Sequence, residues 1–173
     1  NIGYICDYPP GIRENGGQYT HAAIWFIIAL YKTGQKDKAY EYLYMLSGIN
    51  HCKNSADAAI YKAEPYVLSA DVYSGDNAGR AGWTWYTGAA SWYYVAIVRY
   101  LFGITFKNGV ITVDPALPDK TERACINIRF NGSTITVDVD NSVKTGEWHF
   151  VFNGVEYNTN SLDLREISRD KTI

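Results

Sequence analysis

The side chains best suited to chemistry gather near the start of the chain. Arg13, Glu14, Asn15, Gln18 and His21 place two opposite charges, two amides and an imidazole within one short stretch. Prolines at positions 9 and 10 and a glycine at 11 precede them, and glycines at 16 and 17 interrupt them, so this backbone cannot continue a regular helix or strand. A polar loop delivered to the end of a helix often forms the floor of a pocket. The alternative is a tight interhelical turn whose charges face water.

The residues that follow this loop predict a buried helix. The run 22–31 is apolar on every side, and Thr20 fits as its N-cap. His21 falls in the first turn, where free backbone N–H groups and the helix dipole favour an anion. His21 could therefore bind phosphate or sulfate, or it could be a hydrogen-bonded core histidine. Spacing alone does not decide between them.

A second glycine-rich loop, residues 74–82, leads into another apolar helix that is expected over 89–102 and ended by Gly103. Thr87 and Gly88 stand before this helix and offer a hydroxyl, a close backbone approach and free N–H groups, which together make half of an anion site. No Walker-type lysine accompanies them, so nucleotide binding is not supported. Trp85 and its aromatic neighbours could stack on a sugar ring or pack under the loop.

Other classes of site have little support. Glycoside chemistry with paired carboxylates would need a second acid near Glu14, and Asp7, Asp71 and Asp76 are candidates by composition only. For these acids, a solvated or ion-paired role is the stronger interpretation. Metal-ligand spacing is absent, and a net charge of −2 gives no case for nucleic acid.

The cysteines and the hydropathy pattern give expectations about the cellular compartment of the protein. The chain has three widely spaced cysteines, which are predicted to be reduced and buried, as in a cytoplasmic protein. No stretch reaches the ~18 apolar residues of a membrane span. Residue 1 is not methionine, so we expect the chain to begin inside a longer protein.

Periodicity predicts an α+β fold with a boundary near residue 103. A helix is expected over 36–46, a turn of helix over 56–62, and a further helix over 63–73 with Pro65 in its first turn. Gly34 is placed to end the first apolar helix. Beyond 103 the pattern alternates, with Asn-Gly turns at 108–109, 131–132 and 153–154 and a last strand containing Trp148, Phe150 and Phe152. This second part predicts an antiparallel sheet or sandwich.

Several motifs, in order, resemble the C-terminal part of glycoside hydrolase family 94, which holds inverting disaccharide and oligosaccharide phosphorylases. They are Tyr8-Pro-Pro-Gly-Ile-Arg-Glu-Asn-Gly-Gly-Gln-Tyr-Thr-His21-Ala-Ala-Ile-Trp25, Tyr61-Lys-Ala-Glu-Pro-Tyr-Val67, Ala70-Asp-Val-Tyr73, Gly79-Arg-Ala-Gly-Trp-Thr-Trp-Tyr-Thr-Gly-Ala-Ala90 and Val113-Asp-Pro-Ala-Leu-Pro118. The first motif looks most like the phosphorylase-type region of cyclic β-1,2-glucan synthases and β-1,2-oligoglucan phosphorylases.

This resemblance implies a fold and a set of site residues. Residues 1–103 would be the last helices of an (α/α)6 barrel, and 104–173 a C-terminal β-sandwich. His21, Thr87 and Gly88 match the family's phosphate-binding positions. Glu14 matches a residue lining the sugar subsites, and Arg13, Asn15, Gln18 and Trp85 are expected to bind substrate with it.

The resemblance also implies a reaction. Phosphate attacks the anomeric carbon of a β-glucan oligosaccharide, while an aspartic acid from an Asp-Trp-Asn-Asp-type motif protonates the departing oxygen. No such motif occurs here, so the chain is expected to be an inactive C-terminal fragment that needs the rest of its polypeptide. Inorganic phosphate is the expected co-substrate, with no cofactor. A homodimer, and a cytoplasmic location or the cytoplasmic side of a membrane-bound parent, are further expectations. A hydrolase on a similar barrel and a non-catalytic carbohydrate-binding module are the competing readings.

Overall fold

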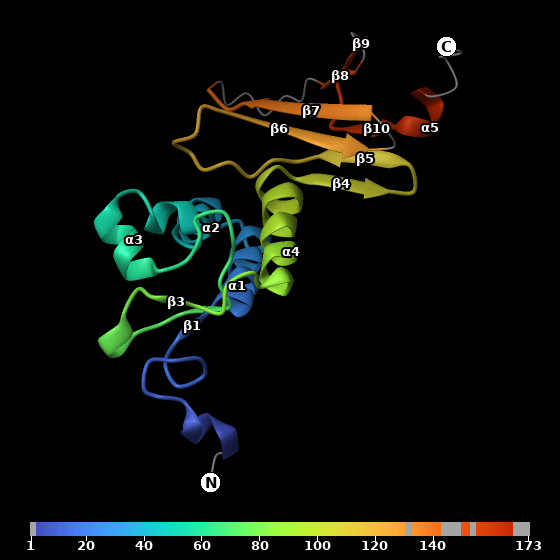
Figure 1. Ribbon diagram of the computed structural model, residues 1–173. Coiled ribbons are helices and arrows are strands. Elements are labelled where there is room, and N and C mark those ends of the chain that lie inside the picture. Colours follow the sequence, from blue (N-terminus) through green and yellow to red (C-terminus); the bar gives the residue numbers. More distant parts are fainter. Residues whose placement is uncertain (1–2, 131–132, 143–149, 153–154, 168–173) are drawn as a thin grey trace. The chain divides into compact units, whose positions relative to one another are not determined.

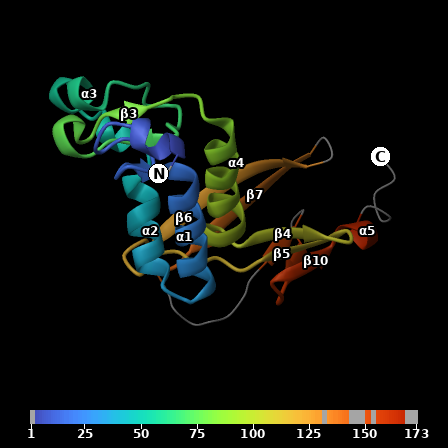
Figure 2. The same ribbon diagram turned by 90° about the horizontal axis from the view of Figure 1, so that it is seen from below.

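A computed structural model describes residues 3–130, 133–142, 150–152 and 155–167 of the chain (Figures 1 and 2). The chain divides into two compact units, residues 1–96 and 97–173. The first unit is mainly helical and the second mainly antiparallel strand, which confirms the predicted α+β class.

In the first unit, helices α1 (Thr20–Lys32), α2 (Lys36–Met45) and α4 (Thr87–Val95) lie side by side, with α1 in contact with both others (Figures 1 and 2). A shorter helix, α3 (Ser55–Tyr61), begins at Asn54, whose side chain accepts a hydrogen bond from the Asp57 amide at 2.9 Å. Short 3-10 turns cover Gly3–Asp7, Gly48–His51 and Gly75–Asn77. The predictions for 36–46 and 56–62 are therefore confirmed.

The end of α1 follows from one glycine. Gly34 has φ +76°, and its amide donates to Tyr31 O at 3.0 Å while the Gln35 amide donates to Leu30 O at 2.9 Å. These two bonds satisfy carbonyls that a helix end otherwise leaves unpaired. The predicted C-terminal glycine is confirmed.

Replacing Gly34 with alanine should lower the free energy of unfolding by about 1 kcal/mol, because a side chain is strained at positive φ. No atom of the described residues lies within 4 Å of the added Cβ, so strain is the whole cost. Urea unfolding of the chain and its G34A variant measures the difference. Equal unfolding midpoints and slopes would contradict this role for Gly34.

Two predictions about α1 were wrong. The N-cap is Tyr19 rather than Thr20, which is the first helical residue and is buried. The helix is also not buried all round: Trp25 and Phe26 are 53% and 52% exposed, whereas Ile24 and Ile27 are fully buried. α2 and α4 both contact α1. The Trp25 ring lies 5.8 Å from that of Trp92 in α4, and the Phe26 ring lies 5.7 Å from that of Tyr42 in α2, so these two side chains are half covered rather than buried.

The helix predicted over 63–73 is not present in the structure. Its last residues form strand β2 (Asp71–Val72), which pairs with β1 (Gln18–Tyr19) on one side and β3 (Ala81–Gly82) on the other. The Ala70 amide donates to Trp83 O at 2.9 Å and the Tyr86 amide to Leu68 O at 3.0 Å. Tertiary backbone pairing thus outweighs the local helical pattern.

The second apolar helix changes form along its length. It is α-helical in α4 and π-helical over Ala96–Leu101, and it begins at Thr87 rather than at residue 89. Gly103 follows at φ +62°, with its Cα so close to the Asp114 carbonyl that a Cβ would overlap it. The prediction that Gly103 ends this helix is confirmed. The close approach of the Asp114 backbone explains why this position holds a glycine.

The second unit is built from hairpins. β4 (Ile104–Lys107) and β5 (Val110–Val113) pair across Asn108-Gly109, where both turn residues have positive φ. β10 (Ser161–Asp163) pairs with the other edge of β5, and α5 (Leu164–Ile167) follows it. β6 (Arg123–Phe130) pairs with β7 (Ser133–Asp140), and β8 (Phe150–Phe152) with β9 (Val155–Tyr157). The predicted turns at 131–132 and 153–154, and Trp148, lie outside the described residues.

The cysteine prediction was partly wrong. The three cysteines are unpaired thiols, but Cys6 and Cys125 are exposed and Cys52 is half-buried, so they are not buried core residues. Among the helices of the described residues, none is long and apolar enough to cross a bilayer.

Candidate functional site

The glycine-rich loop is a closed structure tied to the second loop. The Gly11 amide donates to Asn15 O at 2.7 Å and the Gly17 amide to Arg13 O at 2.8 Å. Ser74, from the second loop, donates from its amide to Gly11 O at 2.9 Å and from its hydroxyl to Gly16 O at 2.8 Å. The two loops therefore position each other, and neither is a free surface turn.

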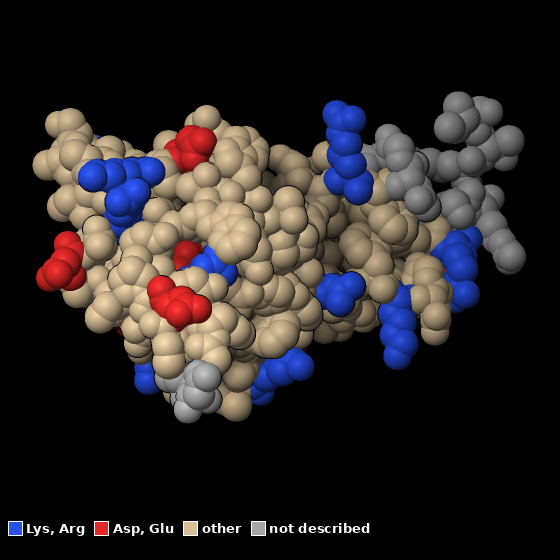
Figure 3. Space-filling model, turned by 60° about the horizontal axis from the view of Figure 1, so that its bottom comes forward, with Lys and Arg blue, Asp and Glu red and all other residues tan. Residues whose placement is uncertain are grey.

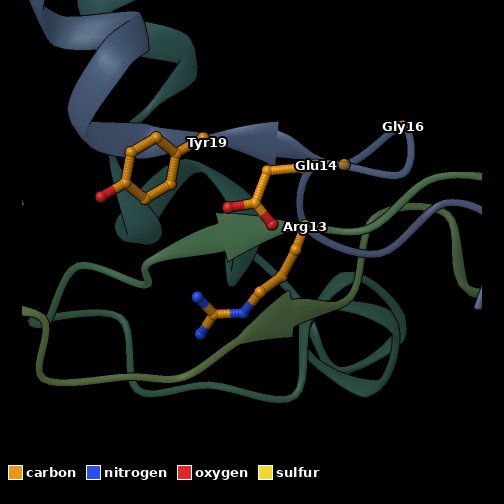
Figure 4. Close-up of a pocket in the computed structure, with 5 residues that line it drawn as sticks. Arg13, Glu14, Gly16 and Tyr19 are labelled. Atoms are coloured by element: carbon orange, nitrogen blue, oxygen red, sulfur yellow. The ribbon is translucent and has the colours of Figure 1, made fainter. Parts of the chain in front are cut away.

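This loop borders a pocket of about 190 Å³ lined by Arg13, Glu14, Gly16, Gly17 and Tyr19 (Figure 4). In Figure 4 the Glu14 carboxylate lies between the Tyr19 ring and the Arg13 side chain. Carboxylate and guanidinium groups together can accept from and donate to sugar hydroxyls. The pocket thus has the size and polarity for part of a sugar.

The backbone around Arg13 is held in unusual conformations. Arg13 has φ +48°, and its guanidinium lies 3.9 Å above the ring of Trp83, which itself has φ +58°. A cation over an indole face is an attractive arrangement. Non-glycine residues at positive φ carry strain and tend to cluster at functional sites.

Asp71 is hydrogen-bonded to the loop that borders this pocket. It is 1% exposed, and its Oδ2 accepts a hydrogen bond from the Arg13 amide at 3.2 Å. Its Oδ1 is buried without a hydrogen-bond partner among the described residues. Burial raises the pKa of the Asp71 carboxyl, although the positive charge and amide of Arg13 partly offset this.

The raised pKa predicts a pH-dependent stability. The folded chain retains the Asp71 proton to higher pH than the unfolded chain, so the free energy of unfolding should fall as pH rises from the ordinary carboxyl pKa through the raised one. Asp71→Asn keeps an oxygen acceptor for the Arg13 amide but cannot titrate. The variant should therefore gain stability relative to wild type across that window, as urea unfolding between about pH 4 and about pH 8 would measure. Parallel pH profiles for the two proteins would contradict the assignment.

At the other end of the pocket, α1 and α4 begin beside each other. Tyr19 and Tyr86 are their N-cap residues, and the two hydroxyl oxygens lie 2.8 Å apart. Neither helix has a side-chain cap hydrogen bond within the described residues. The Thr20 amide of α1 already donates to Ala70 O at 2.9 Å. The two positive dipole ends, lying together, favour an anion.

His21 and Gly88 meet between these helix starts. A Cβ on Gly88 would lie 3.5 Å from His21 Nδ1, so the glycine leaves space beside the ring. The His21 ring packs edge-on against Trp25 with centroids 4.7 Å apart, and lies 6.3 Å from the ring of Trp92. His21 Nε2 is buried and bonds to no group in the described part of the chain. The ring nitrogen that faces Gly88 is Nδ1, and an N–H at that position could donate to an anion.

The other predicted site residues are placed differently. In the described part of the chain, the lining of the pocket does not include Asn15, Gln18 or Trp85. Asn15 donates to Tyr8 O at 2.8 Å within its own loop, and Trp85 donates to Glu64 Oε1 at 3.1 Å while remaining 63% exposed. Gln18 lies in β1, and Thr87 is exposed at the start of α4. The structure thus brings together Arg13 with Glu14, and His21 with Gly88.

Sequence reasoning missed Tyr19 as part of this site, although Tyr19 directly precedes the predicted helix. Trp83 and Tyr86 are the aromatic neighbours of Trp85 for which the sequence leaves open stacking on a sugar ring or packing under the loop. Their contacts with Arg13 and Tyr19 depend on the pairing of β1, β2 and β3, which no local pattern reveals.

Charge and metal-binding groups give no competing site. Figure 3 shows acidic and basic side chains dispersed over a largely uncharged face. Within the described residues, no group of three or more His, Cys, Asp or Glu side chains could hold a metal ion. Among the described residues, no metal site thus competes with the helix starts and the Arg13–Glu14 pocket.

Comparison with known proteins identifies the family of this chain. Residues 1–103 match the model for the catalytic domain of the glycosyl hydrolase 94 superfamily, and 104–145 match the C-terminal domain of glycosyl hydrolase family 65. The chain is 43% identical to cyclic beta-(1,2)-glucan synthase NdvB of Rhizobium meliloti over 84% of its length. It is 28% identical to N,N'-diacetylchitobiose phosphorylase of Vibrio furnissii over 89%, and 27% identical to 1,2-beta-oligoglucan phosphorylase of Listeria innocua over 88%.

The chain spans only part of these relatives: 5% of NdvB, 19% of the Vibrio enzyme and 16% of the Listeria enzyme. The family resemblance inferred from the motifs is confirmed by the match to more than half of the chain. This chain belongs to the glycosyl hydrolase 94 superfamily, as a region related to cyclic β-1,2-glucan synthases and β-glycan phosphorylases.

Proposed function

We propose that this chain is the C-terminal part of a carbohydrate phosphorylase that cleaves β-glucan by inverting phosphorolysis. It supplies the phosphate-binding groups and part of the sugar-binding wall. The observation that carries the proposal is the meeting of His21 and Gly88 between two uncapped helix starts, beside the Arg13–Glu14 pocket. Relatives named as phosphorylases support the reaction class, and two relatives named for 1,2-linked β-glucans support the linkage.

The proposed roles follow from the donors available. A His21 ring N–H, the Thr87 hydroxyl and first-turn amides that include Gly88 hold the oxygens of phosphate, with the helix dipoles opposing its charge. Arg13 and Glu14 bind hydroxyls of the sugar whose anomeric carbon is attacked. Asn15, Gln18 and Trp85 complete the wall in the complete protein.

The reaction needs one group beyond these. A phosphate oxygen forms a bond to the anomeric carbon as the glycosidic C–O bond breaks, and the departing oxygen takes a proton from a carboxylic acid. We assign that acid to a part of the protein outside this chain, so the chain alone should be inactive. No organic cofactor takes part.

The proposed architecture is an (α/α)6 barrel whose last helices are residues 1–103, followed by a β-sandwich over 104–173. The two family matches support this division, since one ends at residue 103 and the other begins at 104. We place the protein in the cytoplasm, or on the cytoplasmic side of a membrane-bound parent, with a homodimer as its expected assembly.

Product analysis tests the function. The complete protein is incubated with β-1,2-glucooligosaccharides, with and without inorganic phosphate, and products are followed by phosphorus and proton NMR. Attack with inversion at a β-linked carbon should give the α-anomer of the sugar 1-phosphate, only when phosphate is present. Free sugar formed without phosphate would indicate a hydrolase. No product from any β-glucan would favour a binding or structural module.

A further inference from the structure

The hydrogen bond between the Tyr19 and Tyr86 hydroxyls joins residues that are 67 positions apart in the chain. Each tyrosine is the N-cap of its helix in extended conformation, with φ −93° at Tyr19 and −81° at Tyr86. The bond therefore connects the starts of α1 and α4 by their side chains. Thr87 and Gly88 directly follow Tyr86 at the start of α4. His21 stands two residues after Tyr19 at the start of α1.

Tyr19 borders both halves of the candidate site. Its ring lines the pocket with Arg13 and Glu14, and it also stacks toward His21 with a centroid distance of 6.1 Å. In Figure 4 its hydroxyl points away from the Glu14 carboxylate. The ring thus serves the sugar pocket while the hydroxyl is directed to Tyr86.

Core packing does not account for this arrangement. Tyr19 is 42% exposed, and a half-exposed ring gains less from burial than a core tyrosine such as Tyr61. The hydrogen bond to Tyr86 is the main reason that the pKa of Tyr19 is raised, with burial second. Both observations favour a hydroxyl pair that holds geometry at the site surface.

Resting on the proposed function, we propose that Tyr86 is a positioning residue for phosphate. Through its hydroxyl it fixes Tyr19, and thereby the spacing of the two helix starts that carry His21 and Gly88. It acts through Tyr19 and touches no reacting atom. The pair should therefore affect phosphate binding, whereas the Tyr19 ring should still serve the sugar.

Phenylalanine variants of the complete protein test this. Tyr86→Phe and Tyr19→Phe each remove one hydroxyl and keep the ring, so each should raise the KM for phosphate about fivefold, the factor that one neutral hydrogen bond contributes. The double variant should show the same fivefold rise, because both single changes break one bond. KM for the glucan should stay unchanged in Tyr86→Phe, because Tyr86 is not among the residues that line the pocket.

Tyr93→Phe is the matched control. Tyr93 lies in the same helix and donates its hydroxyl to Leu43 O at 3.0 Å, so this variant loses a tyrosine hydrogen bond away from the helix start. It should lower Tm and leave the KM for phosphate at the wild-type value. A phosphate effect in Tyr93→Phe equal to that of Tyr86→Phe would mean that the tyrosines act by general destabilisation, and would overturn the proposal.

Three further results would refute the positioning role of Tyr86, and the phosphate requirement of the wild-type protein tests the proposed function separately. Additive effects of the two Phe substitutions, a wild-type KM for phosphate in either variant, or a rise in KM for the glucan alone would refute the hydroxyl pair as a positioning device. If the wild-type protein cleaves β-glucan without needing phosphate, the proposed function fails, and this inference fails with it. Phosphate-dependent cleavage with unaffected variants refutes the inference alone.

Discussion

Replacing His21 with alanine should raise the phosphate concentration that the complete protein needs by about 10- to 100-fold. That range corresponds to about 1.4–2.7 kcal/mol, close to what one hydrogen bond to a charged group contributes. The expectation rests on the position of His21 between two uncapped helix starts and against Gly88. Initial rates of sugar 1-phosphate release, measured against phosphate concentration, give the shift.

His51→Ala is the control for this variant. His51 belongs to the same unit, but its ring stacks on Tyr61 at a centroid distance of 4.9 Å, and its Nε2 lies 2.6 Å from Met45 O. Its loss should leave the phosphate requirement unchanged. If His21→Ala shows the wild-type KM for phosphate, His21 is a structural histidine and the proposed phosphate site is wrong.

Replacing Gly11 with alanine should disrupt the sugar pocket. Gly11 has φ +87°, and an added Cβ would overlap the carbonyl oxygen of Ser74, so strain and a backbone clash act together. Strain alone costs about 1–2 kcal/mol. We expect a loss of at least about 2 kcal/mol in the free energy of unfolding, and a KM for the glucan raised more than about tenfold.

The expected cause is displacement of the loop. Ser74 donates hydrogen bonds to the carbonyls of Gly11 and Gly16, which lie on either side of Arg13 and Glu14. Pushing the two loops apart should therefore displace both Arg13 and Glu14. Gly34→Ala is the matched control, because it adds the same methyl group at positive φ with open space around it. A G11A protein whose stability loss and glucan KM equal those of G34A would show that the contact with Ser74 does not hold the pocket.

Much of the fold could be predicted because its signals are local. The Asn108-Gly109 turn needs only positive φ at two adjacent residues, and Gly34 ends α1 for the same reason. The alternating pattern of β6 likewise identifies its inward face, where Ile128 is buried. These features depend on neighbours within a few positions, so the sequence displays them.

The errors arose where distant segments decide the structure. Residues 63–73 read as a helix, yet Asp71 pairs with Tyr19 on one side and Gly82 on the other. Because this sheet was not foreseen, neither were the bond from the Arg13 amide to Asp71 and the contact of Arg13 with Trp83. Sequence patterns report periodicity, and they do not report such pairings.

The candidate site was predicted in part. His21 and Gly88 could be chosen because each stands at the start of an apolar run after a glycine-rich loop, and the structure brings them together. The proposal that Arg13 and Glu14 bind sugar rests on the family resemblance, and the structure shows that both residues line a pocket. The positive φ of Arg13 leaves no sequence signal, since arginine rarely adopts that conformation.

A crystal structure of the complete protein, grown with inorganic phosphate and without sulfate, tests the central claim most directly. We predict phosphate between the starts of α1 and α4, with one oxygen accepting a hydrogen bond from the His21 ring and another from the Gly88 amide. Crystals of the His21→Ala variant grown under the same conditions should hold no phosphate at this position. A protein side chain filling the space beside His21 and Gly88, or phosphate bound only elsewhere, would contradict the account.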